Sequence, residues 1–355
     1  MNNKRLKKQI VISLAVLVIS LIFAYACRFE IVAGMVRPLS NFIASGLNCI
    51  VSLVPFSLMQ IVVPAFILGT AVYIITCLAK KKWLEWVPKV TLSIAYIVFA
   101  YVFFYNYGFS LPYSSNALPY TIEKHSVDTL IEVTEMLIDD LNDANRKLER
   151  DENGEAIFDD FRENANKVND GYRNLMAKYD FTNAWYLGKV KHAGILAEPM
   201  AYLDINGIFF PFIVEANAGS TVKTNYPFII AHEQAHTLGV VRENEANFFA
   251  FLACLESGDE QLAYSAYMMA YVYANNAIYR ENPEKGYELL LTLDKDVLDD
   301  INRLNEHAKK YDTPAKEVGE KVNDTMLKVN GQEDGIKTYG YMTDLLISYY
   351  LSDQE

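Results

Sequence analysis

The chain has 355 residues, 52% of them hydrophobic, and a formal net charge of −12 at pH 7. The charge is unevenly divided, because residues 1–107 carry ten Lys and Arg against two acidic residues, which leaves 22 bases and 42 acids for the rest. The acidic second part repels polyanions, so nucleic acid is not expected as a partner. The chain has four cysteines, and three of them lie in the apolar first part, so no disulfide framework is predicted.

Three apolar runs in the first part are each long enough to cross a bilayer, which takes about 20 residues. They cover residues 9–26, 57–78 and 90–107. We therefore predict a membrane domain at residues 1–107 with three transmembrane helices. The stretch between the first two runs carries Arg28, Glu30 and Arg37, and we interpret it as an extracytoplasmic loop with room for a surface-lying helix.

Basic residues flank the predicted spans unevenly. The first span follows Lys4, Arg5, Lys7 and Lys8, and the connection between the second and third spans holds Lys80, Lys81, Lys82 and Lys89. Because cytoplasmic loops of membrane proteins are enriched in Lys and Arg, both groups are expected in the cytoplasm. Three crossings then place the chain after Tyr107 outside the cell membrane, and we expect a multi-pass membrane protein with the lipid bilayer as a partner.

Beyond the membrane, residues 108–125 are predicted as a linker and residues 126–355 as a separate domain. Apolar residues at helical spacing follow Ser126, a plausible N-cap, and a second helix is predicted at 158–179, after a turn at 151–154. Strand character is confined to 205–214, with a tight turn at Asn206-Gly207. The remainder is predicted to be almost wholly helical.

The chemistry-bearing motif is His232-Glu233-Gln234-Ala235-His236. The preceding run from Tyr226, with Pro227 near its start, is typical of a helix N-terminus. Two histidines four residues apart project from one helix face, as a pair of zinc ligands requires. Glu233 is rotated by about 100° from His232, beside the metal, where it can take a proton from a zinc-bound water. We therefore predict Zn²⁺ as the cofactor.

A catalytic zinc needs a third protein ligand and an open position. Gly239 permits a break after the first helix, and a second helix is predicted to begin near Arg242. Arg242 stands where the HExxHxxGxxH zincins have their third histidine, so that variant is excluded. Glu243 and Glu245 remain as candidates, and two residues apart on a helix they cannot both face one ion.

Residues 243–247, Glu-Asn-Glu-Ala-Asn, resemble the Glu-x-x-Ala-Asp/Asn element of glutamate-type zincins, which include membrane-bound CAAX-processing and heat-shock proteases. The resemblance implies that Glu243 is the third ligand and that Asn247 steadies a ligand histidine. The connection between the two helices is tighter here than in those families, so Glu245 stays an alternative to Glu243.

A longer resemblance joins the chain to an uncharacterised family of bacterial integral membrane proteins that have an N-terminal membrane region and an HExxH ectodomain. The resembling segments are 211–217, 227–251 and the C-terminal stretch from 322–324 through 335–341. This resemblance implies the metal site and the topology and names no reaction.

Two further features of zincin catalysis have candidates in the sequence. In zincins an edge strand pairs with the substrate backbone, and residues 208–214 are the stretch that fits, with a half-buried core strand as the alternative. A donor to the oxyanion is also needed, for which Tyr339 is the candidate because Gly335 and Gly340 indicate a tight site; Tyr341 and His192 are alternatives.

The predicted fold class is therefore mainly α, α+β in detail: three transmembrane helices followed by an α-rich, zincin-like extracytoplasmic domain with a small edge sheet. The leading hypothesis for function is a zinc metallopeptidase that acts on a peptide or protein substrate, with Glu233 as general base. The alternative is a non-catalytic, zinc-stabilised sensor or scaffold for a membrane protein partner, which a site closed by both acids would favour. A transporter is disfavoured because the spans lack interior charged residues.

Overall fold

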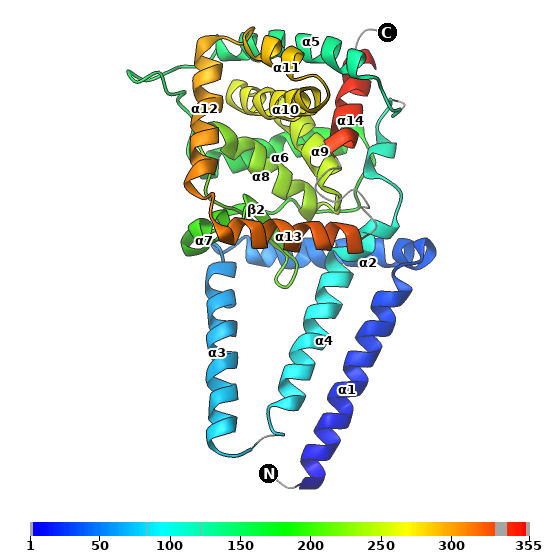
Figure 1. Ribbon diagram of the computed structural model, residues 1–355. Helices are drawn as coiled ribbons and strands as arrows, with labels where there is room; N and C mark the ends of the chain where they lie inside the picture. The colour runs from blue at the N-terminus through cyan, green and yellow to red at the C-terminus, as the bar shows by residue number, and fades with distance from the viewer. Residues whose placement is uncertain (1–2, 83, 121, 331–338, 353–355) are drawn as a thin grey trace. The chain divides into compact units, whose positions relative to one another are not determined.

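The structure is a computed structural model (Figure 1) that describes residues 3–82, 84–120, 122–330 and 339–352. The chain forms two compact units. The membrane unit consists of Met1–Pro112, Asn183–Gly188 and Phe210–Glu215, and the helical domain consists of Tyr113–Thr182, Lys189–Phe209 and Ala216–Glu355. The fold is mainly helical with one small sheet, as the sequence predicts.

The membrane unit is built from four long helices. They are α1 (Asn3–Ala26), α2 (Glu30–Val51), α3 (Met59–Ala79) and α4 (Val87–Phe104), followed by a 3-10 helix, η1 (Asn106–Ser110). Three of them, α1, α3 and α4, are long and apolar enough to cross a membrane. The prediction of three helices long and apolar enough to span a membrane is confirmed, with the third running from Val87 to Phe104 instead of covering 90–107.

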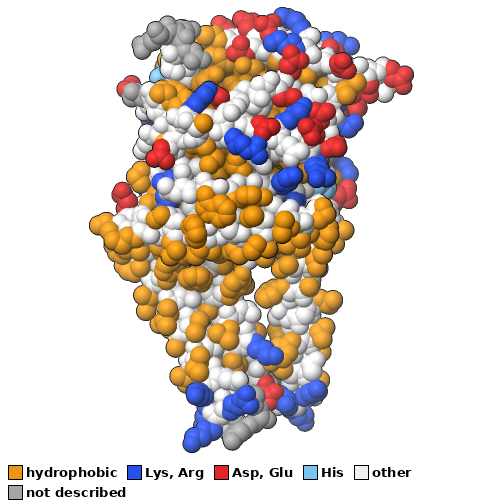
Figure 2. Space-filling view, turned by 180° about the vertical axis from the view of Figure 1, so that it is seen from behind, with side chains coloured by type: hydrophobic (Ala, Val, Ile, Leu, Met, Phe, Trp, Pro, Cys, Tyr) orange, Lys and Arg blue, Asp and Glu red, His pale blue; other side chains and the backbone are white. Residues whose placement is uncertain are grey.

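Helix α2 occupies most of the stretch between the first two spans, where the sequence predicts a loop with room for a surface-lying helix. It runs across the ends of α3 and α4 instead of alongside them (Figure 1). At the other end of the apolar helices, Lys and Arg side chains gather together (Figure 2).

Glu215, which lies far along the chain, caps the N-terminus of α3 within the membrane unit. Its carboxylate accepts hydrogen bonds from the backbone N–H groups of Leu58 and Met59, both at 3.0 Å, and from the Ser57 hydroxyl at 3.2 Å. A carboxylate stabilises the first turn of a helix because that turn has unpaired N–H donors and a partial positive charge. The segment 210–215 is thereby tied to the membrane unit.

The helical domain contains the remaining helices. After a 3-10 helix η2 (Ser114–Ala117) they are α5 (Val127–Asn145), α6 (Phe161–Lys178), η3 (Gly194–Leu196), α7 (Ala197–Ala201), η4 (Lys223–Asn225), α8 (Tyr226–Thr237), α9 (Glu243–Glu256), α10 (Glu260–Glu281), α11 (Pro283–Leu290), α12 (Lys295–Lys310), α13 (Pro314–Val329) and α14 (Tyr339–Ser352). Helix α5 begins where predicted, and the Ser126 hydroxyl accepts the Thr129 N–H as its N-cap. Helix α6 begins three residues later than predicted because Asp160 caps it.

The centre of this domain is formed by α8 and α9, which are buried on nearly all sides. Phe228 and Ile230 on α8, and Phe248, Phe249 and Phe251 on α9, are 0% exposed. Neither helix has the polar face of a surface helix, since both pack against α6 and α10 as well as each other (Figure 1). A side chain carried by such a helix has little freedom to move.

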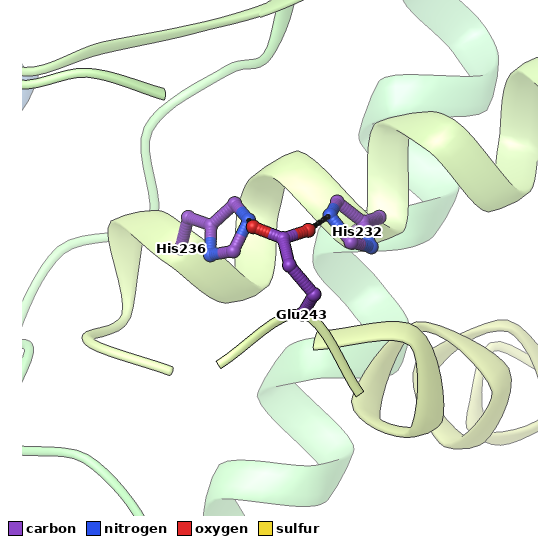
Figure 3. Close-up of side chains that lie close together, drawn as sticks. All are labelled: His232, His236 and Glu243. Atoms are coloured by element: carbon purple, nitrogen blue, oxygen red, sulfur yellow. Dashed lines mark hydrogen bonds and ion pairs between the residues drawn. The ribbon is translucent and has the colours of Figure 1, made fainter. Parts of the chain in front are cut away.

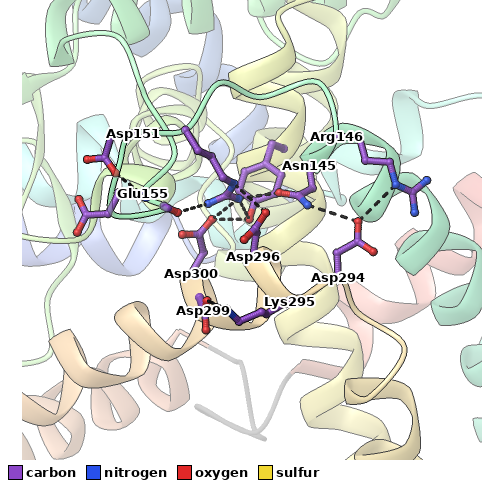
Figure 4. A network of polar contacts seen from close by, with 12 residues as sticks. Asn145, Arg146, Asp151, Glu155, Asp294, Lys295, Asp296, Asp299 and Asp300 are labelled. Atoms are coloured by element: carbon purple, nitrogen blue, oxygen red, sulfur yellow. Dashed lines mark hydrogen bonds and ion pairs between the residues drawn. The ribbon is translucent and has the colours of Figure 1, made fainter.

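A buried ion-pair network ties α5, α10 and α12 together (Figure 4). Asp300 of α12 is 1% exposed and accepts from the guanidinium of Arg150 at 2.8 Å and from the Tyr264 hydroxyl at 2.7 Å. Arg150, which follows α5, also donates to Asn145 at 2.6 Å. Because the charges are paired and hydrogen-bonded, their burial is tolerated.

The sheet is smaller and differently placed than predicted. It has the order β1-β3-β2, with β1 (Lys191–His192) parallel to β3 (Glu215–Ala218) and β2 (Gly207–Phe210) at one edge. The predicted strand at 205–214 is wrong in extent, because it stops at Phe210. Pro211 has no N–H to donate, and Val214 turns the chain with a φ of 55°, so the segment reverses direction before β3.

Candidate metal centre

His232, His236 and Glu243 meet at one point between α8 and α9 (Figure 3). One ligand atom of each lies within 4.8 Å of the others. The Nε2 atom of His232 is 3.1 Å from Oε2 of Glu243, and the Nε2 atom of His236 is 3.6 Å from Oε1. Zinc bonds of about 2.0–2.1 Å in a tetrahedron place ligand atoms about 3.3 Å apart, which is close to these two distances, one to each oxygen of Glu243.

The turn between α8 and α9 brings Glu243 back to the histidines. Gly239 adopts a φ of 87°, a left-handed conformation that glycine accepts at low cost. Arg242 is extended, and α9 begins at Glu243 itself. The carboxylate that starts α9 is therefore held over the face of α8 that carries His232 and His236.

The outer ring nitrogens fix the tautomer of both histidines. Nδ1 of His232 is 2.7 Å from Oδ1 of Asn247, and Nδ1 of His236 is 2.7 Å from the carbonyl oxygen of Val240. Both partners are acceptors, so each Nδ1 carries a proton, and each Nε2 faces the Glu243 carboxylate, where it offers a lone pair once it is deprotonated. Two lone pairs and a carboxylate that converge need a cation among them, and the donor set of two imidazoles and one carboxylate fits zinc.

The electrostatics of the cluster also call for a positive charge. Burial acts to lower the pKa of His236, but the neighbouring Glu243 carboxylate outweighs it and raises that pKa to about 9. Burial acts to raise the pKa of Glu243, and the two imidazoles outweigh it and bring that pKa well below its usual value. Without a metal, protons therefore supply the charge that the carboxylate attracts.

Glu233 is buried beside this cluster with an unsatisfied oxygen. The side chain is 3% exposed, and its Oε2 atom has no hydrogen-bond partner among the described residues. Burial raises the pKa of Glu233 to about 7, although the charges of His232 and His236 act to lower it. A carboxyl group with a pKa near neutrality can both accept and return a proton, and its unsatisfied oxygen can still accept a hydrogen bond.

Strand β2 passes directly over Glu233. A Cβ atom at Gly207 would lie 2.4 Å from Oε1 of Glu233, far inside any allowed contact. Gly207 is the first residue of β2, the edge strand of the sheet. This edge strand and the candidate base are thus in close contact, a relation that the sequence does not predict.

Glu245 does not join the cluster. It is fully buried, its Oε1 atom accepts the Ser115 N–H at 2.7 Å, and its Oε2 atom lies 3.6 Å from the Arg242 guanidinium. The Arg242 guanidinium in turn lies over the Tyr113 ring, 4.2 Å from its centroid. Of the two acids that the sequence leaves open, the one placed with the histidines is Glu243.

Tyr273 is a member of the site's surroundings that the sequence analysis missed. Its hydroxyl donates to Oδ1 of Asn247 at 3.3 Å, the same oxygen that holds His232. Asn247 therefore receives two hydrogen bonds on one atom and its orientation is fixed. Nothing in the sequence distinguishes Tyr273, because the chain has 24 tyrosines.

The two candidate oxyanion donors with described side chains, Tyr341 and His192, form hydrogen bonds with residues outside the metal cluster. Tyr339 is the first residue of α14, and its side chain lies outside the described part of the structure. The Tyr341 hydroxyl pairs with the Ser115 hydroxyl at 3.0 Å. His192 lies in β1, where its Nδ1 atom accepts the Gly194 N–H at 3.1 Å. The role of Tyr339 stays a prediction.

A family model described as "Protein of unknown function (DUF3810)" matches residues 36–347. The chain belongs to this family. No curated protein matches it, and no solved structure does. The DUF3810 match runs from α2 into α14, so it includes the helices that carry His232, His236 and Glu243. The family description names no reaction, and the resemblance to glutamate-type zincins stays an expectation from residues 243–247.

Proposed function

We propose that the chain is a membrane-anchored, zinc-dependent metallopeptidase that hydrolyses a peptide or protein substrate. The observation that carries the proposal is the convergence of two Nδ1-anchored histidines on the Glu243 carboxylate, with the unsatisfied carboxyl group of Glu233 beside them. Three protein ligands leave one position of a tetrahedral zinc open, as in catalytic sites.

Each residue of the site has a separate role in the proposed hydrolysis. When bound, zinc supplies a Lewis acid that lowers the pKa of a water and polarises the peptide carbonyl. His232, His236 and Glu243 hold it, while Asn247 and the Val240 carbonyl fix the two imidazole rings. Glu233 takes a proton from the attacking water and passes it to the leaving amine.

The edge strand β2 supports an extended peptide as substrate. An edge strand offers unpaired backbone groups to a further strand, and Gly207 at its start lies against Glu233. A peptide added to β2 would therefore pass beside the candidate base.

The proposed topology has the N-terminus in the cytoplasm and the helical domain outside. Lys4, Arg5, Lys7 and Lys8 precede one span and Lys80–Lys82 follow another, and Lys and Arg side chains gather at one end of the membrane unit (Figure 2). Lys and Arg enrichment is typical of the cytoplasmic side.

A site closed by Glu245 as a fourth ligand would favour the scaffold alternative. Glu245 is instead held by the Ser115 backbone and Arg242, which leaves that reading without a specific observation in its favour.

The test is turnover of a peptide library by the full-length, zinc-loaded chain and by Glu233→Gln. We expect Glu233→Gln to keep its zinc and to lose cleavage by at least about 100-fold, because the proton acceptor is gone while the three ligands remain. Glu245→Gln is the matched control, a second buried glutamate outside the metal cluster, and should keep both zinc and cleavage. Cleavage that survives in Glu233→Gln would contradict the mechanism.

A further inference from the structure

Helix α2 has the reverse of the polarity found in a helix of a water-soluble protein. Its buried residues are small or polar, namely Ala33, Ser40, Asn41, Ala44, Ser45 and Asn48. Its exposed side chains and those just beyond it are large and apolar, with Ile31, Met35, Leu39, Phe42, Ile50 and Leu53 between 55% and 80% exposed. A surface helix in water places its apolar stripe inward, so the medium around α2 is not water.

The polar face of α2 is committed to the rest of the membrane unit. The Ser40 hydroxyl donates to the Phe103 carbonyl at 2.5 Å, at the end of α4. The Tyr107 hydroxyl donates to Oδ1 of Asn41 at 2.9 Å. Turning α2 to hide its apolar face would break these buried hydrogen bonds, so the apolar face stays outward.

The position of α2 identifies what covers that face. Only three residues separate the end of α1 at Ala26 from the start of α2 at Glu30, and α1 is apolar enough to span a bilayer. α2 therefore begins at the edge of the membrane, and it then runs across the ends of α3 and α4 (Figure 1). A broad band of hydrophobic side chains lies at this end of the apolar helices, away from the basic end (Figure 2).

Trp185, from the segment 183–188, is fixed on α2. Its indole N–H donates to the Phe42 carbonyl at 3.1 Å, and its backbone N–H donates to the Ser45 hydroxyl at 3.2 Å. The ring stays 55% exposed. A tryptophan whose N–H is satisfied and whose ring faces outward is typical of the boundary between lipid headgroups and acyl chains.

We propose that α2 and Trp185 form a docking surface for one leaflet of the bilayer, with α2 lying in the membrane plane at the headgroup–acyl boundary. The charged residues of α2 are Glu30 and Arg37, which cancel, so an uncharged phosphatidylcholine surface is sufficient and anionic lipid is not required. The proposal does not depend on the metal centre or its activity.

The first test is the depth of single spin labels at Ile31→Cys, Leu39→Cys and Ile50→Cys, in the full-length chain with its native cysteines replaced by alanine, in phosphatidylcholine nanodiscs. Residues 31 and 50 are about 28 Å apart along the helix axis. We expect all three labels at one shallow depth, more accessible to oxygen than to a water-soluble nickel complex. A label at Ala44, which is 8% exposed, is the control and should be shielded from both reagents.

Each other pattern would overturn the proposal. If the depth of the labels changed steadily from Ile31 to Ile50, α2 would span the membrane. If the nickel complex reached the labels better than oxygen did, the apolar face of α2 would lie in water. If the labels were protected from both reagents, a protein partner would cover that face. A second measurement avoids the cysteine changes: with Trp83→Phe and Trp86→Phe, fluorescence of Trp185 should be quenched more by lipids brominated near the headgroup than near the chain ends. Absence of quenching by either lipid would contradict an interfacial Trp185.

Discussion

Two neutral acceptors, the Asn247 side chain and the Val240 carbonyl, set the ligand geometry of His232 and His236. The substitution Asn247→Ala should weaken zinc binding about 10- to 100-fold, because the ring of His232 loses the partner that fixes its tautomer and orientation. Competition with a chromophoric chelator measures this. Tyr273→Phe, which leaves Asn247 in place, should have a smaller effect, and equal affinities in Asn247→Ala and wild type would contradict the assigned role.

The buried carboxyl group of Glu233 predicts a pH dependence of stability in the metal-free protein. Burial raises its pKa from 4.5 to about 7, so the folded protein holds this proton more tightly than the unfolded chain. This proton contributes fully to the free energy of unfolding when the pH is below the pKa of Glu233 in the unfolded chain. The contribution, about 3 kcal/mol in all, is lost as the pH rises through the pKa of Glu233 in the folded protein.

Glu233→Gln lacks this loss, so its unfolding free energy relative to wild type should rise by about 3 kcal/mol from about pH 4 to about pH 8. Thermal unfolding with a chelator present measures the difference. Titrating groups that do not interact with Glu233 are common to both proteins and cancel, whereas the His232 and His236 charges act to lower the pKa of Glu233 and are already part of the value of about 7. A difference that does not change with pH would show that the carboxyl group is not desolvated.

At this scale the sequence predicts the histidine pair and the candidate base, because their spacing on a helix fixes their directions. It cannot choose between Glu243 and Glu245. Both fall in the first turn of α9, and the rotation of that helix is set by the Gly239 turn and by Ser115, which lies far away in the sequence.

At the scale of elements, the contact of β2 with Glu233 is open to a single-atom test. Gly207→Ala places a methyl group 2.4 Å from Oε1 of Glu233, so the carboxyl group must shift. The substitution should reduce peptide cleavage at least about 10-fold while zinc stays bound, since a small displacement of a catalytic group costs much of its effect. Gly69→Ala is the control, because a Cβ there meets nothing within 4 Å. Full activity of Gly207→Ala would separate β2 from the site.

Helices were more predictable than strands for identifiable reasons. Ser126 caps α5 by a local hydrogen bond that sequence spacing reveals. The strand predicted at 205–214 is longer than the observed one because its apolar run continues through Pro211, and the reversal at Val214 gives no sequence signal. The two-residue strand β1 exists only through its pairing with β3.

At the scale of the whole molecule, the charge asymmetry of the chain predicts its orientation. An alkaline phosphatase fused after Glu355 should be active in a bacterial host, because this enzyme forms its disulfides only in the oxidising compartment outside the membrane. A green fluorescent protein fused at the same place and exported by the general secretory route should not fluoresce, because it does not fold correctly there. Replacing Lys80, Lys81 and Lys82 by glutamine should weaken this preference. The opposite pattern of reporters would place the helical domain in the cytoplasm.

The three spans follow from composition, because apolar runs near bilayer length need no tertiary information. The membership of segments 183–188 and 210–215 in the membrane unit does not follow from composition. They belong to the membrane unit through contacts such as Trp185 with Phe42 and Glu215 with Met59, and these pairs are separated by more than a hundred residues.

The most direct test of the central claim is the zinc content and coordination of the purified full-length chain, compared with Glu243→Ala and Glu245→Ala. The account predicts one zinc per chain, held by two imidazole nitrogens and one carboxylate with an open position, lost in Glu243→Ala and retained in folded Glu245→Ala. X-ray absorption at the zinc edge reports the ligands, and circular dichroism confirms that each variant is folded. A wild-type chain without stoichiometric zinc, or a site lost only in Glu245→Ala, would contradict the account.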